Sequence, residues 1–148
     1  MKKIVSAYLV KLRRGNPFLA TLSLYMNYTL TDRVERFDTD GRNARINPAY
    51  FDQLGQEQKM GVMLHVTLHS ALLHTARRGV RIAEIWNVAS DIVVNAIIAD
   101  TSFPPPPDTA IEPRYADLSV EQVYARLLAS TSSLGTGSCE VHSVDGSS

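Results

Sequence analysis

His65 and His69 are the residues best suited to chemistry, because they stand four positions apart in a stretch with helical spacing. Side chains at this spacing lie about 40° apart around an α-helix, so both imidazoles can reach one metal ion. Their neighbours are apolar, and an unpaired imidazole is costly in such a setting, which favours a ligand role. The alternative is a pair of histidines on a helix flank, hydrogen-bonded or exposed to water.

Val66 follows the first histidine and occupies the position of glutamate in the HExxH zinc motif. That glutamate is the general base for the metal-bound water. Val66 therefore marks the position of a missing catalytic base, and we expect a site that keeps its metal and loses its chemistry. Glu84 is the other nearby carboxylate that could replace the base, although the sequence does not favour it.

A third ligand is expected from a second apolar helix, predicted over residues 82–99. Asn87, Asp91 and Asn95 recur there every four residues, and Glu84 precedes them by about one turn. Such a polar stripe must face water or meet a polar partner. Zinc sites of this class combine two histidines with one carboxylate and leave one position for water. We therefore expect Asp91 to complete the site and the two asparagines to orient its ligands.

Two other groups compete for the metal. His74 lies about 140° further round than His69 if the helix is continuous, so it reaches the site only if the helix ends or bends near Leu73. It ranks below the carboxylate, and the simpler interpretation is a histidine at a helix end. Cys139 and His142 form a Cys-x-x-His pair in a Ser/Gly tail, which is a weak metal signal.

The elements that must position these residues are few. Hydrophobic spacing predicts a mostly helical α+β fold with a small sheet. We expect helices over residues 1–14, 56–78 and 82–99 and from 119 onward, and strands over residues 21–30 and 44–46. The central helices should pack against the first strand, with Trp86 as the largest core side chain. Residues 1–130 form the predicted domain, and residues 131–148 a flexible tail or linker.

Composition excludes several classes of function. The chain has 148 residues, and its 15 basic and 15 acidic side chains give a net charge of zero, so nothing indicates a nucleic-acid partner. A single cysteine excludes an internal disulfide framework and a cysteine-based zinc cage. The apolar run near the N-terminus is too short and too charged for a membrane span. We expect a soluble, cytoplasmic protein.

The run LHVTLHSALLHTARRGVRIAEIWNVASDIVVNAII, residues 64–98, resembles a bacterial metallopeptidase domain found N-terminal to a von Willebrand A-like domain. Members carry an HExxH helix, a further histidine, an arginine-rich turn and a WNxAxDxxVN helix. The resemblance covers about residues 17 to 130. It implies a zincin-like fold that binds Zn²⁺, with a small sheet beside the active-site helix and a second helix bringing the third ligand.

The expected function follows from the resemblance and from its departure at Val66. The leading hypothesis is a zinc-binding metallopeptidase-like domain that is an inactive or weakly active peptide hydrolase. The alternative is a non-enzymatic pseudopeptidase module that binds a protein partner, and a third is a helical domain without metal. The expected partner is a peptide or protein, including a von Willebrand A-like domain.

Overall fold

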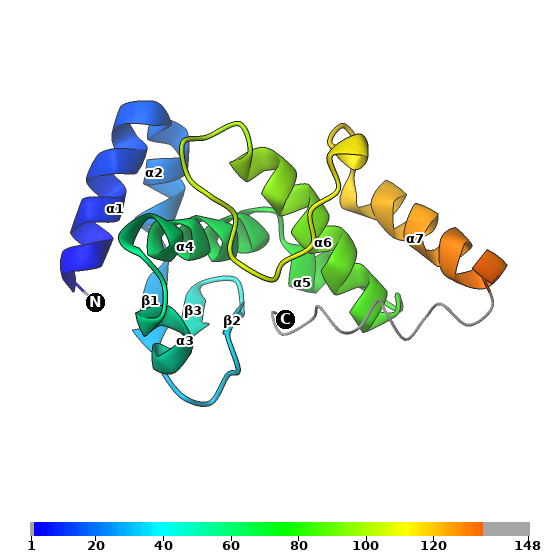
Figure 1. The fold of residues 1–148 in the computed structure, drawn as a ribbon, viewed down its shortest axis with the longest axis horizontal. Coiled ribbons are helices and arrows are strands. Elements are labelled where there is room, and N and C mark those ends of the chain that lie inside the picture. Colours follow the sequence, from blue (N-terminus) through cyan, green and yellow to red (C-terminus); the bar gives the residue numbers. More distant parts are fainter. Residues whose placement is uncertain (1, 135–148) are drawn as a thin grey trace.

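The computed structural model describes residues 2–134 (Figure 1). This part of the chain is mostly helical and contains a three-stranded sheet, as the predicted α+β class requires. Helix α4 (Gln56–Ala71) lies at the centre, with α1 (Lys2–Gly15) and α2 (Pro17–Ser23) at one end of it. No helix within the described residues is long and apolar enough to cross a membrane.

The sheet contains β1 (Asn27–Leu30), β2 (Phe37–Thr39) and β3 (Asn43–Ile46), in the order β1-β3-β2. The central strand β3 runs parallel to β1 and antiparallel to β2. The alternation along β3 buries Ala44 and Ile46 completely and exposes Asn43 and Arg45. Because β2 also packs on α4, the sheet forms a small layer beside the central helix.

The strand predicted over residues 21–30 is wrong in its first part: residues 21–23 belong to α2, and residues 24–26 form the turn that leads to β1. Asn16 starts this helix, since its side-chain oxygen accepts a hydrogen bond from the backbone nitrogen of Leu19 at 3.2 Å. Pro17 occupies the first turn, where its missing N–H costs nothing. The hydroxyl of Ser23 then meets that of Tyr8 in α1 at 2.8 Å. These local signals outweigh the period-two alternation that suggested a strand.

The helix predicted over residues 56–78 is interrupted. Helix α4 ends at Ala71, and Leu73 takes a left-handed conformation (φ 57°, ψ 37°) before the short α5 (His74–Arg77). Gly79, with φ of 57°, ends the segment as predicted. The bend is the condition under which His74 could turn back toward the histidine pair.

Helix α6 (Ala83–Ile98) matches its prediction and packs on both α4 and α7 (Val120–Leu134). The expected packing of Trp86 against the first strand is wrong. Its ring is 1% exposed but belongs to a second core cluster, 6.1 Å from the ring of Tyr124 in α7. The amphipathic helix α7 has its own buried face, and Trp86 packs against that face.

Helix α7 is capped by Ser119, as predicted. The Ser119 hydroxyl accepts from the backbone N–H of Gln122 at 3.2 Å, and the Gln122 side chain accepts from the backbone N–H of Ser119 at 2.8 Å. The helix continues past residue 130 to Leu134, and residues 135–148 of the predicted tail lie outside the described part of the chain.

Residues 99–119 connect α6 to α7 and include a 3₁₀ turn, η1 (Pro113–Tyr115). We call residues 99–112 the strap, because this segment passes across α4 and α6 (Figure 1). It approaches α4 at Gly61, where an added Cβ would lie only 2.1 Å from the carbonyl oxygen of Pro104. A glycine at position 61 therefore lets the strap close on the central helix. Helix α3 (Pro48–Asp52) completes the fold beside the sheet.

Candidate metal centre

The predicted ligands His65, His69 and Asp91 come together between α4 and α6. The two histidines lie one turn apart on α4, and the carboxylate reaches them from α6. Their side chains are 0%, 5% and 1% exposed. Within the described residues, this is the one cluster of histidine, cysteine and acidic side chains that could hold a metal ion.

The three facing atoms form a nearly equilateral triangle. The Nε2 atoms of His65 and His69 are 2.9 Å apart, and each lies 3.0 Å from Oδ1 of Asp91. Ligand atoms about 2.0–2.1 Å from a tetrahedral zinc ion would be about 3.3 Å apart. The triangle is slightly tighter than this, and the donor set of two imidazoles and one carboxylate is the set that zinc takes in hydrolytic sites.

Asn95 fixes the orientation of the first imidazole. Its amide nitrogen donates to the carbonyl oxygen of Ala110 at 2.8 Å and to Oγ1 of Thr109 at 2.9 Å. The Thr109 hydroxyl donates in turn to the carbonyl oxygen of Pro106 at 2.7 Å, so it can only accept from the amide. The amide oxygen is therefore the atom that lies 3.0 Å from Nδ1 of His65.

This orientation selects the tautomer of His65. Because the Asn95 oxygen can only accept, Nδ1 of His65 carries the proton. Burial, followed by the neighbouring charge of His69, lowers the pKa of His65, which favours the neutral ring. A neutral ring protonated at Nδ1 directs the lone pair of Nε2 into the triangle. This is the arrangement that outer hydrogen bonds impose on metal-binding histidines.

His74 lies behind the triangle and contributes no atom to it. Its Nδ1 is 2.9 Å from Nδ1 of His69, on the side of that ring away from Asp91. The Trp86 indole nitrogen donates to the backbone oxygen of His74 at 2.7 Å and holds the bend in place. Burial lowers the pKa of His74 to about 3, so its ring is neutral. His74 therefore contacts a candidate ligand without belonging to the triangle.

The charge and unsatisfied atoms of Asp91 also suit a cation. Burial alone would raise the pKa of Asp91, but the two neighbouring imidazoles lower it to about 2, so the side chain is an anion in a nearly closed site. Its second oxygen, Oδ2, is buried without a hydrogen-bond partner among the described residues. A buried anionic oxygen with no donor is costly, and a cation would compensate it.

The position of the missing base lies within the core. Val66 is 1% exposed and belongs to the larger apolar cluster formed by α1, α2, the sheet and α4. Glu84 is exposed at the start of α6, and Asn87 is half-buried. Asn95 contacts His65, the contact that an orienting asparagine would require. The Cys139–His142 pair lies outside the described residues.

Three residues that surround the candidate metal centre were not predicted from the sequence. Thr109 holds Asn95 from the strap, and Phe37 of β2 places its ring edge-on to His65 with 5.4 Å between ring centres. Tyr50 packs on Phe37, and its buried hydroxyl has no partner among the described residues. Burial raises the pKa of Tyr50 to about 12, so the hydroxyl stays protonated. These residues are distant in sequence and follow no local pattern.

Comparison with protein families gave one match. The family described as a putative metallopeptidase domain matches residues 3–148, nearly the whole chain and more than the region of resemblance seen in the sequence. Searches of curated proteins and of solved structures gave no match.

Proposed function

The chain belongs to the family of putative metallopeptidase domains, and from this premise we propose that it is a zinc-binding, zincin-like domain with impaired peptidase chemistry. His65, His69 and Asp91 would hold Zn²⁺. The zincin-like assignment is supported by α4, which carries the histidine pair and packs against the sheet on one side and α6 on the other.

One observation carries this proposal: three buried ligand atoms face one another within 3.0 Å, with the lone pair of His65 Nε2 directed at an anion. Without a cation, this lone pair and the carboxylate oxygen would repel each other. The hydrogen bond that His65 donates to Asn95 and the contact between His69 and His74 fix the two imidazoles from behind, so the ligand set is arranged in advance.

The residues around the triangle support the impaired chemistry. When bound, zinc supplies a Lewis acid that lowers the pKa of a coordinated water to about 7. This chain offers no proton acceptor at position 66, because the Val66 side chain is apolar and packed in the core. General acid–base groups contribute about 10²–10⁴-fold to such reactions, and we expect a loss of this size. Access is also narrow, since His69 is the most exposed ligand at 5%.

Metal analysis of the purified chain tests the ligand assignment. We expect about one zinc ion per chain. The variants His69→Ala and Asp91→Ala should lose it, whereas Asp52→Ala, which removes an exposed carboxylate from α3, should keep it. Stoichiometric zinc in His69→Ala would refute the assignment.

The enclosed site favours a second candidate function, a pseudopeptidase module that binds a peptide or protein through its outer surface. The ligands would then hold the fold together through the metal and would not meet a substrate. Val66 would not form part of that surface, because it is 1% exposed. Peptide hydrolysis by the zinc-loaded chain, compared with that of the His69→Ala variant, separates the two functions.

A further inference from the structure

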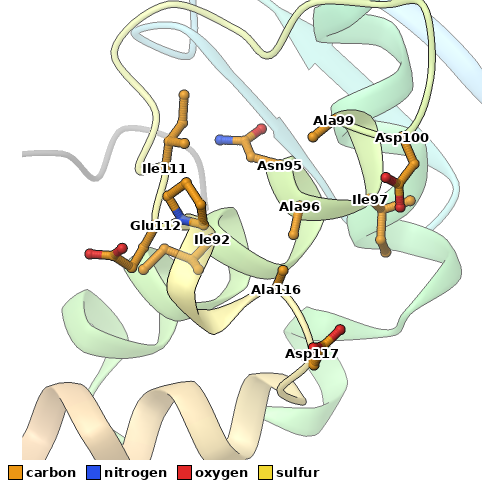
Figure 2. Close-up of a pocket in the computed structure, with 11 residues that line it drawn as sticks. Ile92, Asn95, Ala96, Ile97, Ala99, Asp100, Ile111, Glu112, Ala116 and Asp117 are labelled. Atoms are coloured by element: carbon orange, nitrogen blue, oxygen red, sulfur yellow. The ribbon is translucent and has the colours of Figure 1, made fainter.

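A pocket of about 320 Å³ opens between α6 and the segment that includes the end of the strap and η1 (Figure 2). It does not include the triangle of metal ligands, but Asn95, which fixes His65, forms part of its wall. Pockets for whole small molecules measure about 300–1,000 Å³. This pocket lies at the lower end of that range, so it suits a single side chain better than a large ligand.

The wall of the pocket is divided into an apolar part and an acidic part. The apolar part comes from α6 and the opposite segment, and includes Ile92, Ala96, Ile97, Ile111 and Ala116. Figure 2 shows Asp100 and Asp117 at separate positions along one side of the pocket, whereas Glu112 lies on the other side with its carboxylate directed away. None of the described residues that line the pocket is a lysine, arginine or histidine.

Two of the three carboxylates are uncompensated. Glu112 is paired, because one of its oxygens lies 3.3 Å from Nε of Arg114. Asp100 and Asp117 are exposed, and neither side chain has a hydrogen-bond or ion-pair partner within residues 2–134. Their charges therefore remain available at the mouth of an apolar cavity.

We propose that this pocket binds the basic side chain, arginine or lysine, of a peptide or protein partner. The methylene stem would lie on the apolar wall, and the cationic head would meet Asp100 and Asp117. This division of one side chain into an apolar stem and a charged head matches the division of the pocket. The proposal names a partner chemistry and does not depend on a metal at His65, so either can fail without the other.

The test titrates the full chain with the tripeptide N-acetyl-Ala-Arg-Ala-amide. Binding is measured from the changes in the amide NMR shifts of the protein. Binding of a single side chain should be weak, with a Kd on the order of 1 mM, and should weaken as salt is added. We expect the shifts to saturate and to map to the residues around Ala96, Asp100 and Asp117. The matched probe carries citrulline, which has nearly the same shape without the charge, and should bind at least about 10-fold more weakly.

Variants test each half of the pocket. The double change Asp100→Asn and Asp117→Asn should weaken binding about 10-fold or more, and Ala96→Leu should do the same by filling the apolar part. Asp52→Asn removes an exposed charge from α3, away from the pocket, and should leave binding unchanged. Equal binding of the arginine and citrulline probes would overturn the proposal. So would shifts that map elsewhere, or a double variant that binds like the parent.

Discussion

At the scale of single residues, Val66 decides between a hydrolase and a protein that retains only the metal site. Its side chain is buried in the larger core cluster, and in sequence it directly follows His65, one of the three candidate ligands. A carboxylate at this position would be costly in the core unless it turned toward a cation. A substitution of Val66 by glutamate therefore tests both the site and the packing around it.

The Val66→Glu variant should lower the free energy of unfolding, because it places a charge where an apolar side chain is packed. If the new carboxylate reaches the metal, peptide hydrolysis should rise by up to about 10²–10⁴-fold. The matched control Val66→Gln has nearly the same size but cannot act as a base, so it should share the instability without the activity. Hydrolysis of a mixed peptide pool, with denaturant unfolding alongside, measures both effects. Equal activity of the two variants would show that position 66 does not supply the base.

His74 offers a second test at this scale. Its Nδ1 contacts His69 behind the triangle, so His74→Ala should loosen the orientation of His69 and leave all three ligand atoms in place. Groups of this kind typically contribute about 10–100-fold to metal affinity. Competition with a chelator should therefore show a moderate loss for His74→Ala and a far larger one for Asp91→Ala. The reverse ranking would make His74 a ligand.

At the scale of elements, local sequence predicted the long helices better than the short segments. The apolar residues located α1, which has a buried stripe, and the central helices α4 and α6, which are long apolar segments buried on most sides. It missed α2, where Asn16 and Pro17 start a helix inside an alternating stretch, and β2, which has only three residues. The bend at Leu73 was foreseen only as a condition, since a left-handed leucine has no local signature.

The same distinction holds for the candidate site. His65, His69 and Asp91 were predicted because the ligands repeat at helical spacing on two apolar helices. The hydrogen bond from Asn95 to Thr109 joins residues 14 positions apart through an irregular strap, and no periodicity encodes such a contact. The strap residues that hold Asn95 are thus known only from the fold.

The approach of the strap to α4 gives a prediction for Gly61. A Cβ at this position would lie 2.1 Å from the backbone oxygen of Pro104, so Gly61→Ala must push the strap away. Overpacking of this kind costs about 1–3 kcal/mol in stability. Gly15→Ala is the matched control, because nothing lies within 4 Å of its added Cβ, and it should be neutral or slightly stabilising. Thermal unfolding compares the two, and equal melting temperatures would mean that the strap does not depend on Gly61.

At the scale of the whole molecule, two core clusters meet at α6, and the candidate metal centre lies where they join. Val94 and Ile98 of α6 belong to the cluster that includes the sheet and α4, whereas Trp86 and Ile92 belong to the cluster formed with α7. Asp91 stands on the same helix and reaches across to α4. A change in either cluster can therefore alter the position of this carboxylate.

Substitutions of Trp86 test whether the packing of the two clusters affects the candidate metal site. Its ring lies between His74 and Tyr124, and its indole nitrogen holds the backbone at His74. Trp86→Ala should cost about 3–5 kcal/mol, a large share of the stability of an ordinary domain. Trp86→Phe keeps a ring but loses the hydrogen bond, so it should cost less. Tyr25→Ala, which truncates a ring that is 71% exposed, should change stability by less than about 0.5 kcal/mol.

The coupling itself is measured by zinc affinity in the same variants. Because the hydrogen bond from Trp86 fixes His74, and His74 orients His69, Trp86→Phe should weaken zinc binding in a protein that remains folded. Circular dichroism must report the fold, since Trp86 is the single tryptophan of the chain. A folded Trp86→Phe protein with the zinc affinity of the parent would show that the second cluster supports the fold without tuning the site. An unchanged melting temperature in Trp86→Ala would contradict the packing of α6 against α7.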